Sequence, residues 1–198
     1  MRKRNNSILK MAGIALMMAM VVIMQAISGI IPPVSGFSIS LVLIPIVLGA
    51  AVYGPKAGAL LGATFGTIVY INCVTGADPG GAMVFQASPV LCFLVVLGKG
   101  TLAGFGSGLV YKLLKEKNAY VAMLCAAIVC PVINTGVFIG CMFLFFMDVL
   151  SAWAGGSNVL GYVLTGLVLA NFVPELIINV VFSPAGERIY RVVKGKLA

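Results

Sequence analysis

Long apolar runs follow one another along the chain, separated by short segments that hold glycine, proline and charged residues. The runs cover residues 8–31, 39–53, 57–74, 87–114, 120–147 and 159–182. A helix needs roughly 20 residues to cross a hydrocarbon core of ~30 Å, so each run is a candidate span, and the short second run needs residues from its flanks. The pattern predicts an all-α integral membrane protein with six transmembrane helices.

The composition agrees with this pattern, because 61% of the residues are hydrophobic and only 9% are charged. Soluble domains carry about 25% charged residues. We therefore expect one transmembrane domain over residues 1–198, with basic tails over about residues 1–7 and 184–198. The net charge of +8 does not require nucleic acid, because the cations flank the apolar runs and suit anionic lipid headgroups.

Six crossings place both termini on one face, and that face then collects the basic residues. Of the 13 Lys and Arg residues, only Lys99 lies elsewhere. The residues on the common face are Arg2, Lys3, Arg4, Lys10, Lys56, Lys112, Lys115, Lys117, Arg188, Arg191, Lys194 and Lys196. The opposite connections hold only Asp78 and Asp148 as charged residues. The positive-inside rule makes the basic face cytoplasmic, so we expect both termini in the cytoplasm.

Small residues recur at helical spacing in two of the predicted spans. Glycines occupy positions 54, 58, 62 and 66 of the third span and positions 100, 104 and 108 of the fourth. Such a face lets two helix backbones approach closely in lipid, so we expect tight packing there. Pro45, Pro131 and Pro174 fall inside apolar runs, where each is expected to bend or break its helix.

The chain offers little for catalysis or metal binding. It has no histidine, and its five cysteines form no C-x-x-C pair and suit small buried apolar side chains. The stretch Gly98-Lys99-Gly100-Thr101 lacks the upstream glycine of a phosphate-binding loop. We therefore expect no metal, no cofactor and no ATPase activity of its own. A membrane-embedded enzyme is a less favoured alternative, because no nucleophile with a base is visible.

Five polar residues from five predicted helices lie at similar depth. Counted at ~1.5 Å per residue from the cytoplasmic ends, they come out roughly 17 to 25 Å up. They are Gln25, Asn72, Lys99, Asn134 and Asn171. Polar groups in hydrocarbon are costly and normally face the interior of the bundle. A level set favours a ligand-binding chamber that opens outward, the alternative being incidental hydrogen bonding between helices.

Lys99 needs a negative partner, since an ammonium near the midplane cannot easily reach either interface. Glu175, on a face with Asn171 and Asn179, is the internal candidate, although it lies about 9 Å lower by the same depth count. An anionic group of a substrate is the external candidate. Lys99 can have both partners in turn if it pairs with Glu175 only when the site is empty.

Three outward connections, residues 32–38, 76–86 and 148–158, frame the mouth of this chamber. The stretch 31–37 combines two prolines with a glycine, as a lid over a pocket would, although ordinary surface turns have the same composition.

Three features resemble the substrate-binding S components of energy-coupling factor (ECF) vitamin transporters. Residues 39–66 read ISLVLIPIVLGAAVYGPKAGALLGATFG, residues 130–140 read CPVINTGVFIG, and six helices in under 200 residues match the family's size. In that family, small residues on the first helix in an A-x-x-x-A pattern dock on a membrane-embedded coupling subunit. Ala15 and Ala19 match that pattern.

The resemblance implies a subunit of a bacterial plasma membrane importer that captures a small water-soluble vitamin from outside. A separate coupling subunit and two cytosolic ATPases would complete the transporter, and the loaded subunit would topple to release its cargo. Pantothenate is the favoured substrate, because its single carboxylate suits one deep lysine among amides. Substrate contacts are assigned to Lys99, Asn134, Asn171, Gln25, Asn72 and Glu175. A structural or accessory subunit without a ligand remains an alternative, which ligand-dependent thermal stabilisation would exclude.

Overall fold

The computed structural model describes residues 2–30 and 40–197, and every regular element in these residues is helical. The elements are α1 (Arg2–Ile30), α2 (Leu43–Tyr53), α3 (Pro55–Thr75), α4 (Pro79–Ala87), α5 (Pro89–Leu114), α6 (Ala119–Phe145), α7 (Met147–Ala154), α8 (Val159–Tyr162), the π-helical segment η1 (Val163–Phe172) and α9 (Val173–Leu197). The prediction of an all-helical protein is therefore confirmed for the described residues. The lid predicted at residues 31–37 lies outside them.

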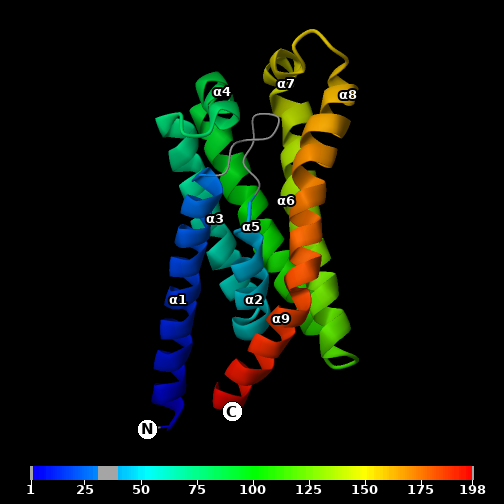
Figure 1. Cartoon of the computed structure of the whole chain (residues 1–198). Helices are drawn as coiled ribbons and strands as arrows, with labels where there is room; N and C mark the ends of the chain where they lie inside the picture. The colour runs from blue at the N-terminus through cyan, green and yellow to red at the C-terminus, as the bar shows by residue number, and fades with distance from the viewer. Residues whose placement is uncertain (1, 31–39, 198) are drawn as a thin grey trace.

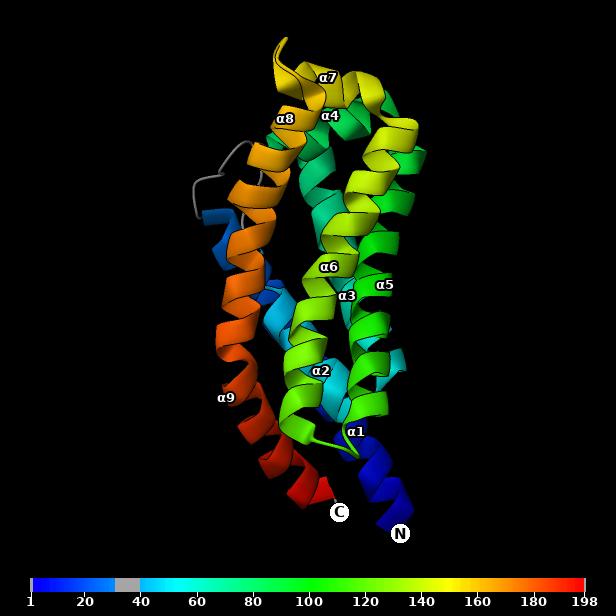
Figure 2. The same cartoon turned by 90° about the vertical axis from the view of Figure 1, so that its right-hand side faces the viewer.

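The long helices run side by side along one axis of the molecule (Figure 1). Both chain ends lie at one end of the bundle, together with the turn that joins α5 to α6, while α4 and α7 cap the other end (Figures 1 and 2). The predicted basic tails continue the helices α1 and α9. A cytoplasmic position for the end that carries the termini remains a prediction from the charge pattern.

The number of membrane crossings differs from the prediction of six. Five helical stretches of the described chain are long and apolar enough to cross a membrane. They are Ser7–Gly29, Pro55–Thr75, Pro89–Leu114, Ala119–Phe145 and Val159–Val193. The second predicted span corresponds to α2, whose 11 residues rise only ~16 Å, about half of the hydrocarbon thickness. Six full crossings are therefore not confirmed.

The short helix α2 lies in the middle of the bundle, near the end that carries the termini (Figure 1). Nine of its 11 residues are buried, against α1, α3, α5, α6 and α9. Pro45 sits in its first turn, where a missing amide donor costs no intrahelical hydrogen bond, so it does not break the helix. Gly54, at a positive φ of 97°, and Pro55 at the start of α3 then form the sharp turn between α2 and α3.

The glycine faces of α3 and α5 pack directly against each other. A Cβ atom on Gly62 would collide with the carbonyl oxygen of Gly100, and one on Gly58 would collide with that of Gly104. The backbones of the two helices are thus in contact, as the spacing predicts. This contact fixes the position of the α5 residues beside α3, Lys99 among them.

The other two prolines that were expected to disturb helices behave differently. The α-helix α6 continues through Pro131 without a break. Pro174 is the second residue of α9, which directly follows the π-helical segment η1, so the helix changes its hydrogen-bond register close to Pro174. Such wide turns re-aim the side chains next to them and are frequent at functional sites. Asn171 lies in this segment.

Large apolar side chains cover the outer surface of the bundle. Leu16, Val90, Leu144 and Leu169 are each more than half exposed, together with many similar residues on all the long helices. Apolar exposure on this scale is typical of a surface that faces lipid.

Candidate functional site

A cavity of about 450 Å³ lies inside the bundle, and polar side chains from six elements line it. The lining includes all six residues that the sequence assigns to a site: Gln25 on α1, Asn72 on α3, Lys99 on α5, Asn134 on α6, Asn171 on η1 and Glu175 on α9. Phe65, Ile68, Val69, Phe138 and Leu167 supply apolar wall. The structure thus brings the predicted residues together around one space, with the mixture of apolar wall and few polar groups that small-molecule sites have.

Lys99 reaches the cavity beside an aromatic ring. Its Nζ lies 4.5 Å from the centroid of the Phe138 ring, a cation–π geometry. Lys99 and Glu175 form no ion pair at 4.0 Å or less, although both line the same cavity. The internal pairing considered from the sequence is therefore not a direct contact in this state, and the Lys99 ammonium is placed where an anionic group in the cavity would meet it.

Glu175 holds the chain segment that leads into α2. Its side chain is 2% exposed, and Oε1 accepts a hydrogen bond of 2.9 Å from the backbone amide of Ser40. The next amide along, that of Leu41, donates to Ser28 Oγ at 3.2 Å. Two side chains from α9 and α1 thus fix the entry to α2 at the edge of the cavity, and Glu175 has a structural role whatever it contributes to binding.

Several buried oxygen atoms around the cavity accept no hydrogen bond from the residues that the structure describes. They are Gln25 Oε1, Asp78 Oδ1, Asn134 Oδ1, Asn171 Oδ1 and Glu175 Oε2. The Gln25 and Asn134 side chains are 8% and 4% exposed, so bulk water does not easily compensate them. A buried acceptor without a donor costs ~1 to 3 kcal/mol. Five such atoms facing one cavity are the arrangement expected of a site whose donors come from a ligand or from ordered water.

Asp78 is a lining residue that the sequence reasoning assigned to the outward connections and not to the site. It precedes α4, and its side chain turns inward beside Lys99, Asn72 and Ala77 in the cavity wall. Burial raises the pKa of the Asp78 carboxyl above its ordinary value, against the opposing effects of the Gly81 amide and of Lys99. The sequence did hold one signal, since an aspartate directly before a proline is typical of a helix start. Residues 76–86 were nevertheless interpreted as an open connection.

The predicted docking residues lie on α1 away from the cavity. Ala15 and Ala19 are both exposed, whereas Met17 and Val21 on the same helix are buried in the bundle. The alanines therefore belong to the outer face of α1. A partner helix has access to them there.

The comparisons with known proteins place the chain in a family. Residues 9–185 match the family described as the ECF transporter, substrate-specific component, and the chain belongs to this family. No characterised protein matches the chain in a search of curated sequences. The resemblance noted from the sequence is thereby confirmed.

Membership defines a membrane-embedded substrate-binding subunit of an ECF transporter, which is a transport component and not a member of an enzyme family. It also implies a small-molecule substrate and association with an ECF coupling subunit and ATPases. The long apolar helices agree with a multi-pass membrane protein.

Proposed function

We propose that the cavity described above is the substrate site and that it captures a small water-soluble vitamin from the outer side of a bacterial plasma membrane. The observation that carries the proposal is the convergence on one cavity of Lys99 with five buried oxygens that have no donor among residues 2–30 and 40–197. A structural or accessory subunit without a ligand would gain nothing from such an arrangement, since each unpartnered oxygen destabilises the fold.

Pantothenate is the substrate that we favour. Its carboxylate would meet the Lys99 ammonium, and a charge-assisted hydrogen bond of this kind is among the stronger polar contacts. Its two hydroxyl groups and its amide N–H are donors for the oxygens of Asn134, Asn171 and Gln25. The apolar wall around Phe65 and Leu167 would receive its methyl groups.

A second substrate class is favoured by one specific observation. Among the described lining residues, two carboxyl groups, Asp78 and Glu175, accompany one cation, Lys99. A ligand with a protonated amine or a cationic ring would meet these acids, and thiamin is one water-soluble vitamin with that chemistry. An anionic ligand would bind through Lys99, whereas a cationic ligand would bind through Asp78 and Glu175.

A melt screen of the purified protein with water-soluble vitamins tests both. A ligand present at 100 times its Kd stabilises a protein by about 2.7 kcal/mol, which is measurable as a shift of Tm. We expect pantothenate to raise Tm while thiamin, riboflavin and folate do not. A shift with thiamin alone would support the second substrate class. No shift with any vitamin would favour the alternative of an accessory subunit without a ligand.

The energised transporter is proposed to follow the family scheme. The loaded subunit would dock through Ala15 and Ala19 on the coupling subunit, and two cytosolic ATPases, shared or dedicated, would drive release of the vitamin. The exposure of both alanines supports this docking face.

A further inference from the structure

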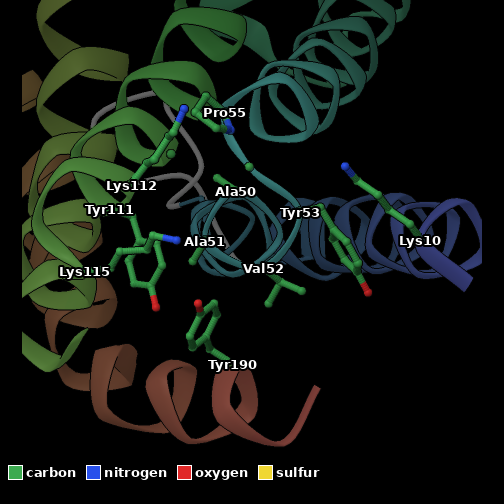
Figure 3. Close-up of a pocket in the computed structure, with 12 residues that line it drawn as sticks. Lys10, Ala50, Ala51, Val52, Tyr53, Pro55, Tyr111, Lys112, Lys115 and Tyr190 are labelled. Carbon is green, nitrogen blue, oxygen red and sulfur yellow. The ribbon is translucent and has the colours of Figure 1, made fainter. Parts of the chain in front are cut away.

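A second cavity, of about 430 Å³, lies at the end of the bundle that carries the termini. It is separate from the proposed substrate site, and the two share no lining residue. Its walls come from α1, the last turn of α2, the start of α3, the last turns of α5 and the C-terminal part of α9 (Figure 3). Tyr53, Tyr111 and Tyr190 furnish three phenol rings in these walls.

Three lysines line this cavity, namely Lys10, Lys112 and Lys115. Lys10 lies on α1, Lys112 lies on α5 and Lys115 directly follows α5, and the side chains of Lys112 and Lys115 extend toward Pro55 and Ala51 (Figure 3). The acidic side chains close to the cavity are already engaged. Glu116 pairs with Lys115 at 3.5 Å on the surface, and Glu187 pairs with Arg191. A surface pair such as Lys115 with Glu116 is weak and easily exchanged for another anion.

Two further features of the cavity favour an anion. Gly54 and Pro55 in its wall begin the 21-residue helix α3, whose N-terminal amides carry partial positive charge. The Tyr111 side chain is 1% exposed, and its hydroxyl group points toward Tyr190 (Figure 3) but has no hydrogen-bond partner in the described part of the chain. The rings of these two tyrosines meet edge to face with centroids 5.1 Å apart. A buried phenol thus has a donor to offer to an oxyanion.

We propose that this cavity binds a phosphate group, held by Lys112 and Lys115, the Tyr111 hydroxyl and the start of α3, with Lys10 at the rim. A phosphate group offers several acceptor oxygens, so it can accept from more than one of these donors. The cavity lies at the end of the bundle that carries the termini, where apolar helices that span a bilayer would reach its headgroups, and an anionic phospholipid supplies such a phosphate there. Free inorganic phosphate has the same acceptor oxygens and is a second possible ligand for the cavity. This site goes beyond the proposed transport function and does not depend on the identity of the substrate.

Native mass spectrometry of the detergent-purified protein titrated with phosphatidylglycerol tests the proposal. Lys112→Gln with Lys115→Gln should lower the affinity for phosphatidylglycerol at least ~10-fold, because two of the three lysines that line the cavity are lost. Lys56→Gln with Lys117→Gln is the matched control, since it removes the same charge from exposed lysines of the same end that do not line the cavity. The control should change the affinity less than ~2-fold. Tyr111→Phe should lower it by about 3-fold or more, and all variants should keep the wild-type Tm.

The outcomes separate the sources of phosphate. Binding of phosphatidylglycerol that inorganic phosphate at 10 mM does not displace identifies the lipid headgroup. Binding of inorganic phosphate alone, lost in the Lys112 and Lys115 variant, identifies free phosphate. Equal losses in both lysine pairs would mean diffuse surface attraction and would overturn the site, as would unchanged binding in the Lys112 and Lys115 variant. A site that takes only an acidic segment of a protein partner would overturn it too.

Discussion

The ammonium of Lys99 lies over the ring of Phe138, with Nζ 4.5 Å from the ring centroid. The lysine comes from α5 and the phenylalanine from α6, and both line the proposed substrate site. Phe138 therefore positions the charge that we assign to substrate recognition. It can do so without neutralising that charge, because the attraction comes from the electrons of the ring face.

Phe138→Leu should weaken pantothenate binding by about 3-fold to 10-fold, because the leucine keeps the apolar wall but removes a cation–π contact of ~0.5 to 2 kcal/mol. Phe138→Tyr retains the ring face and should bind within ~2-fold of wild type. Isothermal titration calorimetry measures both. Equal affinity in the leucine variant would mean that the ring does not position Lys99 in the bound state.

The glycine contact between α3 and α5 is predicted to carry much of the stability of the fold. Gly100→Ala places a methyl group against the carbonyl oxygen of Gly62 and should destabilise the protein by ~1 to 3 kcal/mol. Gly98→Ala, two residues earlier on the same helix, adds a methyl group that meets no described atom outside its own stretch of helix within 4 Å and should be nearly neutral. Thermal unfolding in detergent compares the two variants. Equal Tm values would show that the contact between α3 and α5 accommodates a methyl group without loss of stability.

The structure places the polar residues that the sequence put at one level around a single cavity, and their contact with a substrate stays a prediction. Gln25, Asn72, Lys99, Asn134 and Asn171 all line the cavity, because a polar side chain in an apolar helix has to face inward and helix rise converts its position into depth. The depth count also placed Glu175 too far from Lys99 for easy pairing, and the structure has no ion pair between them.

Other features could not be predicted because they depend on tertiary packing. An apolar run does not reveal that only 11 of its residues form α2, or that the helix around Asn171 widens to π-helical turns. The connections expected as loops contain the short helices α4 and α7, and Asp78 enters the cavity from the first of them. A charged residue in a polar connection is ordinarily solvated, so composition alone gave it no place in the site.

The orientation of the bundle is open to chemical labelling. A cysteine introduced at Ser157 in a background without the five native cysteines should react with an impermeant thiol reagent in intact cells. A cysteine at Lys117, at the opposite end, should react only after the cells are permeabilised. The reverse labelling pattern would mean that the end with the termini faces outward.

Docking on the coupling subunit is predicted to need a flat face on α1. Ala15→Trp with Ala19→Trp should abolish co-purification with the coupling subunit and ATPases, since close helix approach excludes large side chains. Pantothenate binding by the isolated subunit should persist, because both residues are exposed and outside the cavity.

Leu164→Trp with Leu169→Trp provides a control for that experiment, because both leucines are exposed on η1 instead of α1. This control should assemble normally. If the two pairs disrupt assembly equally, the effect belongs to bulk on the lipid-facing surface and not to a docking face.

Isothermal titration of pantothenate into Lys99→Ala tests the central claim most directly. Loss of a charge-assisted contact in a cavity of low dielectric should cost ~2 to 5 kcal/mol and lower the affinity at least ~30-fold, with Tm close to wild type. Lys99→Met with Glu175→Gln, which removes both charges, should bind as weakly as the single variant. Full-strength binding of pantothenate by that double variant would contradict the account, because Lys99 would then serve only to balance Glu175.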